Sequence, residues 1–230
     1  AILNGTITGN AAKQGAVVYN YHGTLEIQSG TYTKNIATNN GGIVYSEGAA
    51  NAKVNISGGT FENNEAQTAT GGIAGGGCTT TITGGTFRYN KAANGGSVLN
   101  VAGSCKAFIS NATITENELK KTSDTVYNGA IMVSGSGELT LENCNIYNNK
   151  GIYKDETNPG SDVSLNSNVK LYIKDNTNIG VIYQRQDKTT INISEEYTGT
   201  MTLIPCNNTY TIGSKLVTFN GEMSAEAKAN

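Results

Sequence analysis

The sequence is organised around the stretch Ser57-Gly58-Gly59-Thr60-Phe61-Glu62-Asn63-Asn64, which recurs in closely similar form as Thr83-Gly84-Gly85-Thr86-Phe87-Arg88-Tyr89-Asn90. In each copy an aromatic or aliphatic anchor follows a small polar residue, and an asparagine stands three places after the anchor. The anchors of six such copies, spaced 25 to 32 residues apart, are Ile7, Tyr32, Phe61, Phe87, Ile114 and Ile146. Self-similarity on this scale is typical of stacked repeats, in which each unit buries its apolar face against its neighbours.

Two further patterns accompany the anchors. A glycine is followed by small or apolar residues, as in Gly41-Gly42-Ile43-Val44, and apolar residues alternate with polar ones, as in Leu25-Glu26-Ile27 and Val54-Asn55-Ile56. Strict alternation predicts half-buried strands, and no helical period is present. We therefore predict an all-β fold, a right-handed parallel β-helix (a β-solenoid) with three short strands per rung and about seven to eight rungs.

The asparagine of each copy falls at a corner of the predicted rung. Asparagine tolerates a left-handed backbone, and its amide can bond the equivalent amides above and below it. The glycine pairs let the backbone bend without a Cβ clash. We predict left-handed corners joined by an amide ladder, formed by Asn10, Asn35, Asn64, Asn90, Asn117 and Asn149.

The repeats define one domain, residues 1–220, followed by a tail at 221–230. Residues 1–162 hold the regular copies, and 163–220 read as atypical terminal rungs. Charged insertions at 118–128 and 150–162 both follow an asparagine corner, so both are expected on the same side of the rod. Loops on a rigid scaffold commonly carry function. The candidate binding residues in these insertions are Lys120, Lys121, Asp124, Tyr127, Tyr153, Lys154, Asp155 and Glu156.

Composition excludes several partners. The formal charge is −2 and only 15% of residues are charged, so no basic stripe exists to bind nucleic acid. No apolar run is long enough to cross a membrane, and no motif indicates a cofactor. The chain begins inside a repeat without Met or a signal peptide, which predicts a fragment or a processed form of a longer protein.

An enzyme is the main alternative, because parallel β-helices also include polysaccharide lyases and hydrolases. Such chemistry needs carboxylates that converge on one face. The glutamates fall on outward positions of different faces, and the aspartates lie outside the regular copies, at Asp124, Asp155, Asp162, Asp175 and Asp187. We therefore predict no catalytic residue, leaving open a carbohydrate-active enzyme whose catalytic rungs lie outside this chain.

An ice-binding solenoid is a minor alternative, suggested by a column of threonines beside the anchors (Thr6, Thr31, Thr60, Thr86 and Thr113). The neighbouring column contains Glu62 and Arg88, which would interrupt a regular ice-binding surface. Threonine stacking within a sheet explains the column more simply.

The cysteines leave two alternatives open. Cys78 and Cys105 each stand four residues before an equivalent isoleucine, so they are expected one rung apart, near the separation of a disulfide. They form either that disulfide or two stacked thiols. Cys144 takes a small-residue position. With a single histidine, His22, expected at an exposed corner beside Tyr19 and Tyr21, no metal site is predicted.

The paired motifs resemble a known family. Gly41-Gly42-Ile43 and Gly95-Gly96-Ser97, together with Phe61-x-x-Asn64 and Phe87-x-x-Asn90, are similar to the passenger repeats of the chlamydial polymorphic membrane proteins. The resemblance covers about residues 1–149 and carries over no catalytic residue. It implies a segment of an exported bacterial surface adhesin, extracellular or cell-surface located, that binds a host or neighbouring-cell glycan or protein. We expect the segment to be a monomer.

Overall fold

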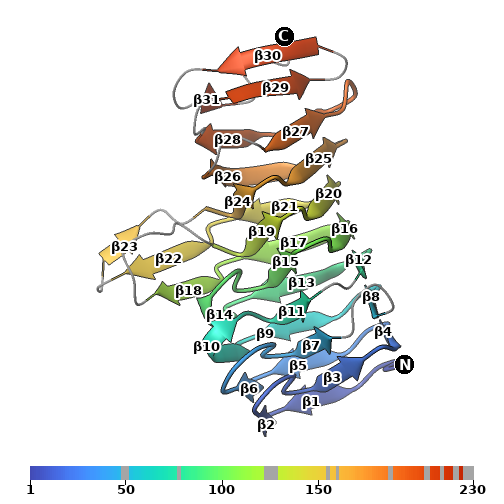
Figure 1. Cartoon of the computed structure of the whole chain (residues 1–230). Helices are drawn as coiled ribbons and strands as arrows, with labels where there is room; N and C mark the ends of the chain where they lie inside the picture. Colours follow the sequence, from blue (N-terminus) through green and yellow to red (C-terminus); the bar gives the residue numbers. More distant parts are fainter. Residues whose placement is uncertain are drawn as a thin grey trace.

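The computed structural model describes residues 1–47, 52–76, 79–121, 129–153, 156–158, 161–185, 189–204, 208–212, 215–219 and 223–224. Within these residues every regular element is a β-strand and none is a helix. The strands form three sheets in which nearly all pairs are parallel, and they follow one another in layers from the N-terminal to the C-terminal end (Figure 1). The predicted all-β class with parallel strands is confirmed, and the arrangement is compatible with a β-helix.

One repeat shows how the chain visits the sheets. From β5 (Thr31–Thr33) it passes through β6 (Ile36–Ala37), β7 (Val44–Glu47) and β8 (Lys53–Ile56), and β9 (Thr60–Glu62) then pairs in parallel with β5. Four strands per repeat replace the three predicted. The strand that the prediction missed, β6 and its equivalents, follows the ladder asparagine and is often too short to show a period of two.

The largest sheet has 15 strands and takes two strands from each repeat. One series follows the anchors: β1 (Thr6–Thr8), β5, β9, β13 (Gly85–Arg88), β17 (Ala112–Thr115) and β21 (Asn145–Tyr147). The other follows the glycine pairs: β3 (Val18–Tyr21), β7, β11 (Ile73–Gly76), β15 (Leu99–Ala102), β19 (Ile131–Gly135) and β24 (Val163–Ser167). The seven-residue strand β26 (Asn178–Gln184) pairs with both series, and β28 (Met201–Ile204) and β31 (Met223–Ser224) follow it.

The two other sheets complete each repeat. The nine-stranded sheet contains β4 (Thr24–Ile27), β8, β12 (Thr79–Ile82), β16 (Lys106–Ser110), β20 (Glu138–Glu142), β25 (Lys170–Lys174), β27 (Thr190–Ile193), β29 (Asn208–Ile212) and β30 (Lys215–Phe219). The seven-stranded sheet contains β2 (Ala11–Ala12), β6, β10 (Glu65–Thr70), β14 (Lys91–Asn94), β18 (Glu118–Lys121), β22 (Lys150–Tyr153) and β23 (Glu156–Asn158).

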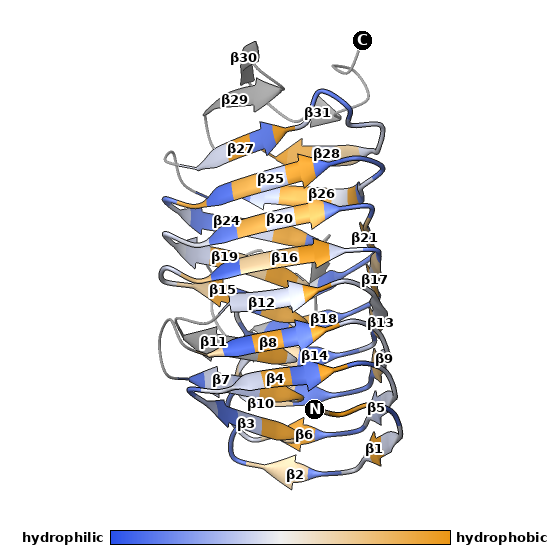
Figure 2. Ribbon diagram, turned by 90° about the vertical axis from the view of Figure 1, so that its right-hand side faces the viewer, coloured by the Kyte–Doolittle hydropathy of each residue, from blue (hydrophilic) through white to orange (hydrophobic). Residues whose placement is uncertain are grey.

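The anchors form the centre of the core. They are in register, and Tyr32, Phe61 and Phe87 stack with ring centroids 4.6 Å apart in both pairs and interplanar angles of 11° and 7°. All three are fully buried. Burying one such side chain contributes about 1.5–3 kcal/mol. The alternation of apolar and polar residues along the strands is visible in Figure 2.

The predicted amide ladder is confirmed. From Asn10 to Asn117, each Nδ2 donates to the Oδ1 of the next ladder asparagine at 2.9–3.0 Å. The backbone N–H of each donor residue reaches the same oxygen at 2.9–3.1 Å. Except for Asn10, the ladder asparagines are buried.

The predicted position of the left-handed corner is wrong by one residue. Positive φ occurs not at the ladder asparagine but at the exposed residue before it, with φ between 56° and 69° at Gly9, Lys34, Asn63, Tyr89, Glu116 and Asn148. Because the ladder uses both the backbone N–H and the side-chain amide of each asparagine, the chain turns one residue earlier.

Glycine is required where neighbouring repeats approach closely. A Cβ added at Gly71 would lie 1.9 Å from the carbonyl oxygen of Gly96, and one at Gly42 would lie 2.7 Å from that of Glu65. Both distances are far below a van der Waals contact. A side chain at either position would clash with the backbone of the neighbouring repeat, as the glycine pairs predict.

The seven-stranded sheet stops at β23. From Val163 onward the described chain alternates between the two larger sheets. Antiparallel pairs then end both of these sheets, β29 with β30 and β28 with β31. β31, at Met223–Ser224, lies within the predicted tail.

Candidate functional site

The predicted binding insertions begin as strands rather than loops. Residues 118–121 form β18, and 150–153 with 156–158 form β22 and β23, which pair antiparallel. β18 pairs in parallel with β22, so the two insertions extend the seven-stranded sheet on one side of the molecule, as predicted (Figure 1). The insertions extend the sheet because their first residues continue its register.

The structure places part of the candidate set. Lys121, Tyr153 and Glu156 occupy one row of this sheet, Tyr153 between the other two. Lys120 is exposed in β18. The other predicted site residues, Asp124, Tyr127, Lys154 and Asp155, lie outside the described residues.

Asp162, at the end of the second insertion, terminates the amide ladder. Its Oδ1 accepts hydrogen bonds from the backbone N–H and the Nδ2 of Asn149 at 3.0 and 2.7 Å. Its Oδ2 accepts one from the N–H of Val181 at 2.8 Å. The side chain is buried, and this burial raises the pKa of the carboxyl group, against the opposing effect of the hydrogen bonds.

The sequence interpretation treated Asp162 as part of a charged loop and missed this role. Val163 pairs with Ile131, so Asp162 stands in the column that holds Ala130 one repeat earlier. A carboxylate in a column of apolar residues is the sequence signal that could have indicated a buried, hydrogen-bonded aspartate.

Three partly exposed carboxylates of the sheets contact cations of the neighbouring repeat. Glu62 lies 2.8 Å from Arg88, and Glu118 lies 3.8 Å from Lys91. Each pair is formed by direct neighbours in the strand register. Such pairs contribute about 0–1 kcal/mol each, so they join repeats without dominating stability.

Glu138 makes two such contacts, to Lys106 at 2.9 Å and to Lys170 at 3.3 Å. The hydrogen bond from Lys106, assisted by that from Lys170, lowers the pKa of Glu138. The same hydrogen bond raises the pKa of Lys106. A carboxylate held ionised between two ammonium groups is poorly suited to act as a general acid.

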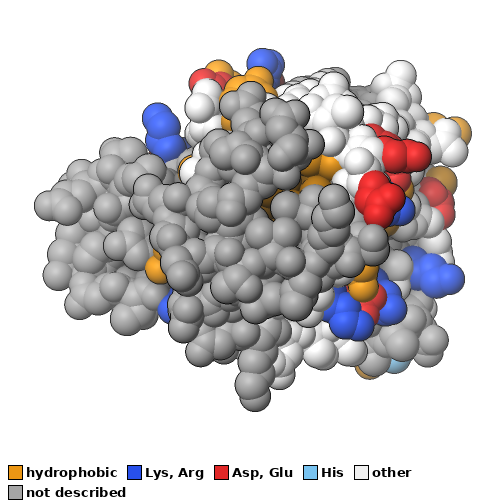
Figure 3. Space-filling view, turned by 90° about the horizontal axis from the view of Figure 1, so that it is seen from above, with side chains coloured by type: hydrophobic (Ala, Val, Ile, Leu, Met, Phe, Trp, Pro, Cys, Tyr) orange, Lys and Arg blue, Asp and Glu red, His pale blue; other side chains and the backbone are white. Residues whose placement is uncertain are grey.

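Seen from above, acidic and basic side chains gather on the side of the molecule that carries the nine-stranded sheet (Figure 3). Over the described residues, no three His, Cys, Asp or Glu side chains come close enough to hold a metal ion.

An aromatic cluster lies at the N-terminal end of the 15-stranded sheet. Tyr19 and Tyr45 form a cross-strand pair with centroids 5.4 Å apart, and the Tyr19 hydroxyl donates to Glu47. This hydrogen bond, more than any other effect, raises the pKa of Tyr19 to about 12. Tyr21 lies edge-on to His22 at 4.2 Å, and His22 is exposed, as predicted.

The described cysteines are buried. Cys105 is buried, whereas Cys78 lies outside the described residues, so their pairing stays a prediction. Cys144 is fully buried in its predicted small-residue position, and its thiol contacts the carbonyl oxygens of Ile109 and Glu142, each at 3.3 Å. Burial raises the pKa of the Cys144 thiol, which makes it a poor nucleophile.

The threonine column has the predicted register, from Thr6 through Thr31, Thr60 and Thr86 to Thr113. Beside it the ion pair between Glu62 and Arg88 breaks the pattern of hydroxyl groups.

Comparisons with protein-family models, with curated proteins and with solved structures find no match to this chain. Among the described residues, no helix has the length and apolar character needed to cross a membrane.

Proposed function

We propose that this chain is a rigid, non-enzymatic segment of an extracellular bacterial surface protein, built as a right-handed parallel β-helix of about seven to eight rungs. The parallel register between successive repeats supports the solenoid. Right-handed crossovers are the rule for parallel strands, which supports the hand. The segment serves as a monomeric stalk or adhesin scaffold that presents a surface to a glycan or protein of a host or neighbouring cell.

The observation that carries this proposal is the use of the carboxylates. Glu62, Glu118 and Glu138 each contact a cation on the adjacent strand, and Asp162 ends the buried ladder. These side chains therefore join one repeat to the next instead of facing a substrate. The outward positions vary from one repeat to the next, whereas the apolar anchors and the ladder asparagines recur, which suits a scaffold that displays a surface.

The binding surface is proposed at the extension of the seven-stranded sheet, residues 118–128 and 150–162. Lys121, Tyr153 and Glu156 are register neighbours in three adjacent strands of this extension. Aromatic and charged groups on a rigid support are suited to recognising polar ligands.

The test is binding to a glycan array and to cultured host cells. Residues 152–159 are replaced by a two-residue Gly-Ser turn, which keeps Asn149 and Asp162. Binding by the intact chain that this variant loses supports the proposal, and Tyr147→Ala, an exposed tyrosine on another sheet, serves as the matched control. Equal binding by the shortened variant contradicts the proposed surface.

The enzyme alternative predicts a different result. Purified chain incubated with polysaccharides would release shorter products, and such cleavage would overturn the non-enzymatic proposal.

A further inference from the structure

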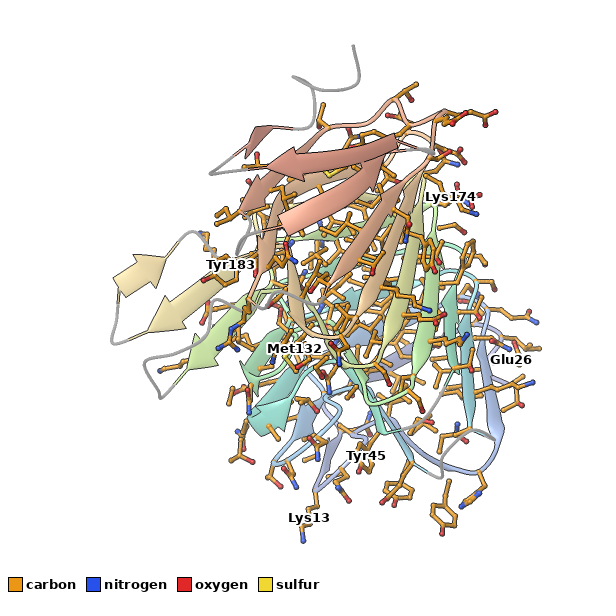
Figure 4. All side chains as sticks on the ribbon, turned by 45° about the horizontal axis from the view of Figure 1, so that its top comes forward. Lys13, Glu26, Tyr45, Met132, Lys174 and Tyr183 are labelled. Carbon is orange, nitrogen blue, oxygen red and sulfur yellow. The ribbon has the colours of Figure 1, made fainter. Side chains whose placement is uncertain are left out.

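The outer face of the nine-stranded sheet, turned toward the viewer in Figure 2, carries a column of outward side chains in register. Two members of this column are aromatic, and the others have amide, hydroxyl or carboxylate groups. From β4 to β27 the column reads Glu26, Asn55, Thr81, Phe108, Thr140, Tyr172 and Asn192. Glu26 and Lys174, labelled in Figure 4, stand on the same side of the molecule and point away from its core.

The two rings are separated by one residue of the column. Phe108 pairs with Thr140, and Thr140 pairs with Tyr172. With strands about 4.8 Å apart, the two ring positions lie about 10 Å apart along the axis of the stack. Both side chains are partly exposed, and among the described side chains neither ring lies against another ring.

This spacing distinguishes Phe108 and Tyr172 from the Tyr19–Tyr45 pair. Tyr19 and Tyr45 lie on adjacent strands and contact each other, so each ring covers part of the other. Phe108 and Tyr172 instead leave room between them for Thr140. Their open surfaces are therefore available to a ligand that reaches across three strands.

The charged groups beside the rings are paired with one another. Lys106, Glu138 and Lys170 run along one edge of the face, in the same three strands, and Glu138 contacts both lysines. The edge therefore presents hydrogen-bond donors and acceptors, with one lysine charge in excess of the single carboxylate. A polyanion would compete with Glu138 for the lysines, whereas a neutral ligand rich in hydroxyl groups meets partners of both kinds.

We propose that this surface, the Phe108–Tyr172 face, binds an extended neutral polysaccharide with β-1,4 linkages, lying parallel to the axis of the stack. In such a chain alternate sugar rings repeat at a distance close to that between the two side chains, and pyranose rings have apolar faces with hydroxyl groups at their edges. The sugar faces rest on Phe108 and Tyr172, and the hydroxyl groups bond Thr140, Lys106 and Glu138. This inference rests on the proposed scaffold role and adds to it a second binding site, on a different sheet from the 118–128 and 150–162 extension.

The test is isothermal titration of the full chain with cellohexaose, cellobiose and the α-linked maltohexaose. Cellohexaose should bind, and cellobiose, whose two adjacent sugar rings cannot reach both side chains, should bind roughly 10-fold more weakly. Maltohexaose follows a curved path and should bind no better than cellobiose. Phe108→Ala and Tyr172→Ala should each weaken cellohexaose binding roughly 10-fold and abolish the dependence on ligand length.

Controls separate loss of the rings from loss of the fold. Tyr147→Ala should bind cellohexaose like the unaltered chain. If either alanine variant unfolds, Phe108→Leu and Tyr172→Leu keep apolar bulk without the ring and should show the same loss of affinity.

Several results would overturn the assignment: no binding of cellohexaose, equal binding by the ring variants, or a preference for polygalacturonate over cellohexaose. These outcomes leave the stalk proposal intact if the 150–162 extension still binds cells. Conversely, cleavage of cellohexaose would overturn the non-enzymatic proposal while supporting the binding face.

Discussion

Asparagine amides, rather than apolar side chains, join the repeats at one corner. The Oδ1 of Asn90 accepts two hydrogen bonds from Asn64, and its Nδ2 donates to the Oδ1 of Asn117 and to the carbonyl oxygen of Phe61 at 3.0 and 2.9 Å. Both donors and both acceptor sites of this buried amide are used. Satisfied networks of this kind specify one register, because any slip leaves several buried groups unpaired.

Replacing Asn90 with alanine tests this role. Asn90→Ala removes the acceptor of the Asn64 backbone N–H and of one Asn64 Nδ2 hydrogen, and it removes one of the two donors to the Asn117 Oδ1. We therefore expect the free energy of unfolding to fall by about 2–4 kcal/mol. Urea denaturation followed by circular dichroism measures the loss. Asn168→Ala, at an exposed position, should change the free energy by less than about 0.5 kcal/mol. A similar small change at Asn90 would contradict a stabilising ladder.

The carboxyl group of Asp162 predicts a pH dependence. Because burial raises its pKa in the folded chain, the folded state takes up a proton at higher pH than the unfolded state. The corresponding stabilisation is present below the unfolded pKa and is lost as pH rises through the folded pKa. Relative to Asp162→Asn, which cannot titrate, the unaltered chain should therefore gain stability on acidification.

Urea unfolding of both proteins between neutral pH and pH about 4 measures this difference. The Asn variant should also be less stable at low pH, since one of its amide N–H groups must face an N–H of Asn149 or Val181. A constant difference across the pH range would show that Asp162 does not titrate in this window.

At the scale of the element, the seven-stranded sheet has its own small core. Ala66, Ala92 and Leu119 form a buried cluster separate from the main core, one residue from β10, β14 and β18 in turn. The ladder asparagine stands two residues before each of them in the chain. This sheet is therefore held by hydrogen bonds, those of the asparagine ladder among them, and by a cluster of three apolar side chains. The larger sheets share the continuous main core.

Leu119→Ala tests how far this sheet depends on its own cluster. Removing the leucine side chain should cost about 2–4 kcal/mol if the effect is global. Because the cluster is separate, we expect hydrogen exchange to accelerate first in β14, β18 and β22, while the amides of β16 and β20 stay protected. Uniform acceleration in all three sheets would show that the cluster is not an independent unit.

The anchors, the ladder and the threonine column could be predicted from the sequence because each depends on one residue type recurring at one spacing. The strand after each asparagine was missed because its inward residues, such as Ala66 and Ala92, are small and few. Asp162 was missed because its role comes from register, which places it beside Asn149 after the β22–β23 excursion. The charged residues were recognisable as outward-facing, but their pairing across strands depends on which repeats become neighbours.

At the scale of the whole molecule, the C-terminal strands cover the edges of the two larger sheets. The antiparallel pairs β28–β31 and β29–β30 follow a long run of parallel strands. Removing residues 205–230 would expose edges of β27 and β28, and open edges pair with other chains. We expect the truncated chain to self-associate, which light scattering would detect.

Asn192→Lys in the truncated chain places a charge on the exposed edge strand β27 and should reduce this association. The intact chain carrying Asn192→Lys is the matched control. A truncated chain that stays monomeric would show that the antiparallel pairs do not protect the edges.

The amide ladder also has a direction. In the bonds from one ladder side chain to the next, every asparagine donates toward the C-terminal end. The last acceptor is a carboxylate, which has no N–H with which to continue. A duplicated repeat spliced in between Asn64 and Asn90 would meet a donor on one side and an acceptor on the other. If the same repeat were placed after Asp162, the side-chain oxygen of its asparagine would receive no hydrogen bond from the Asp162 carboxylate. Duplication of whole repeats upstream of Asp162 would therefore preserve the ladder. Asp162 ends the ladder, and with it the series of repeats that contribute to the seven-stranded sheet.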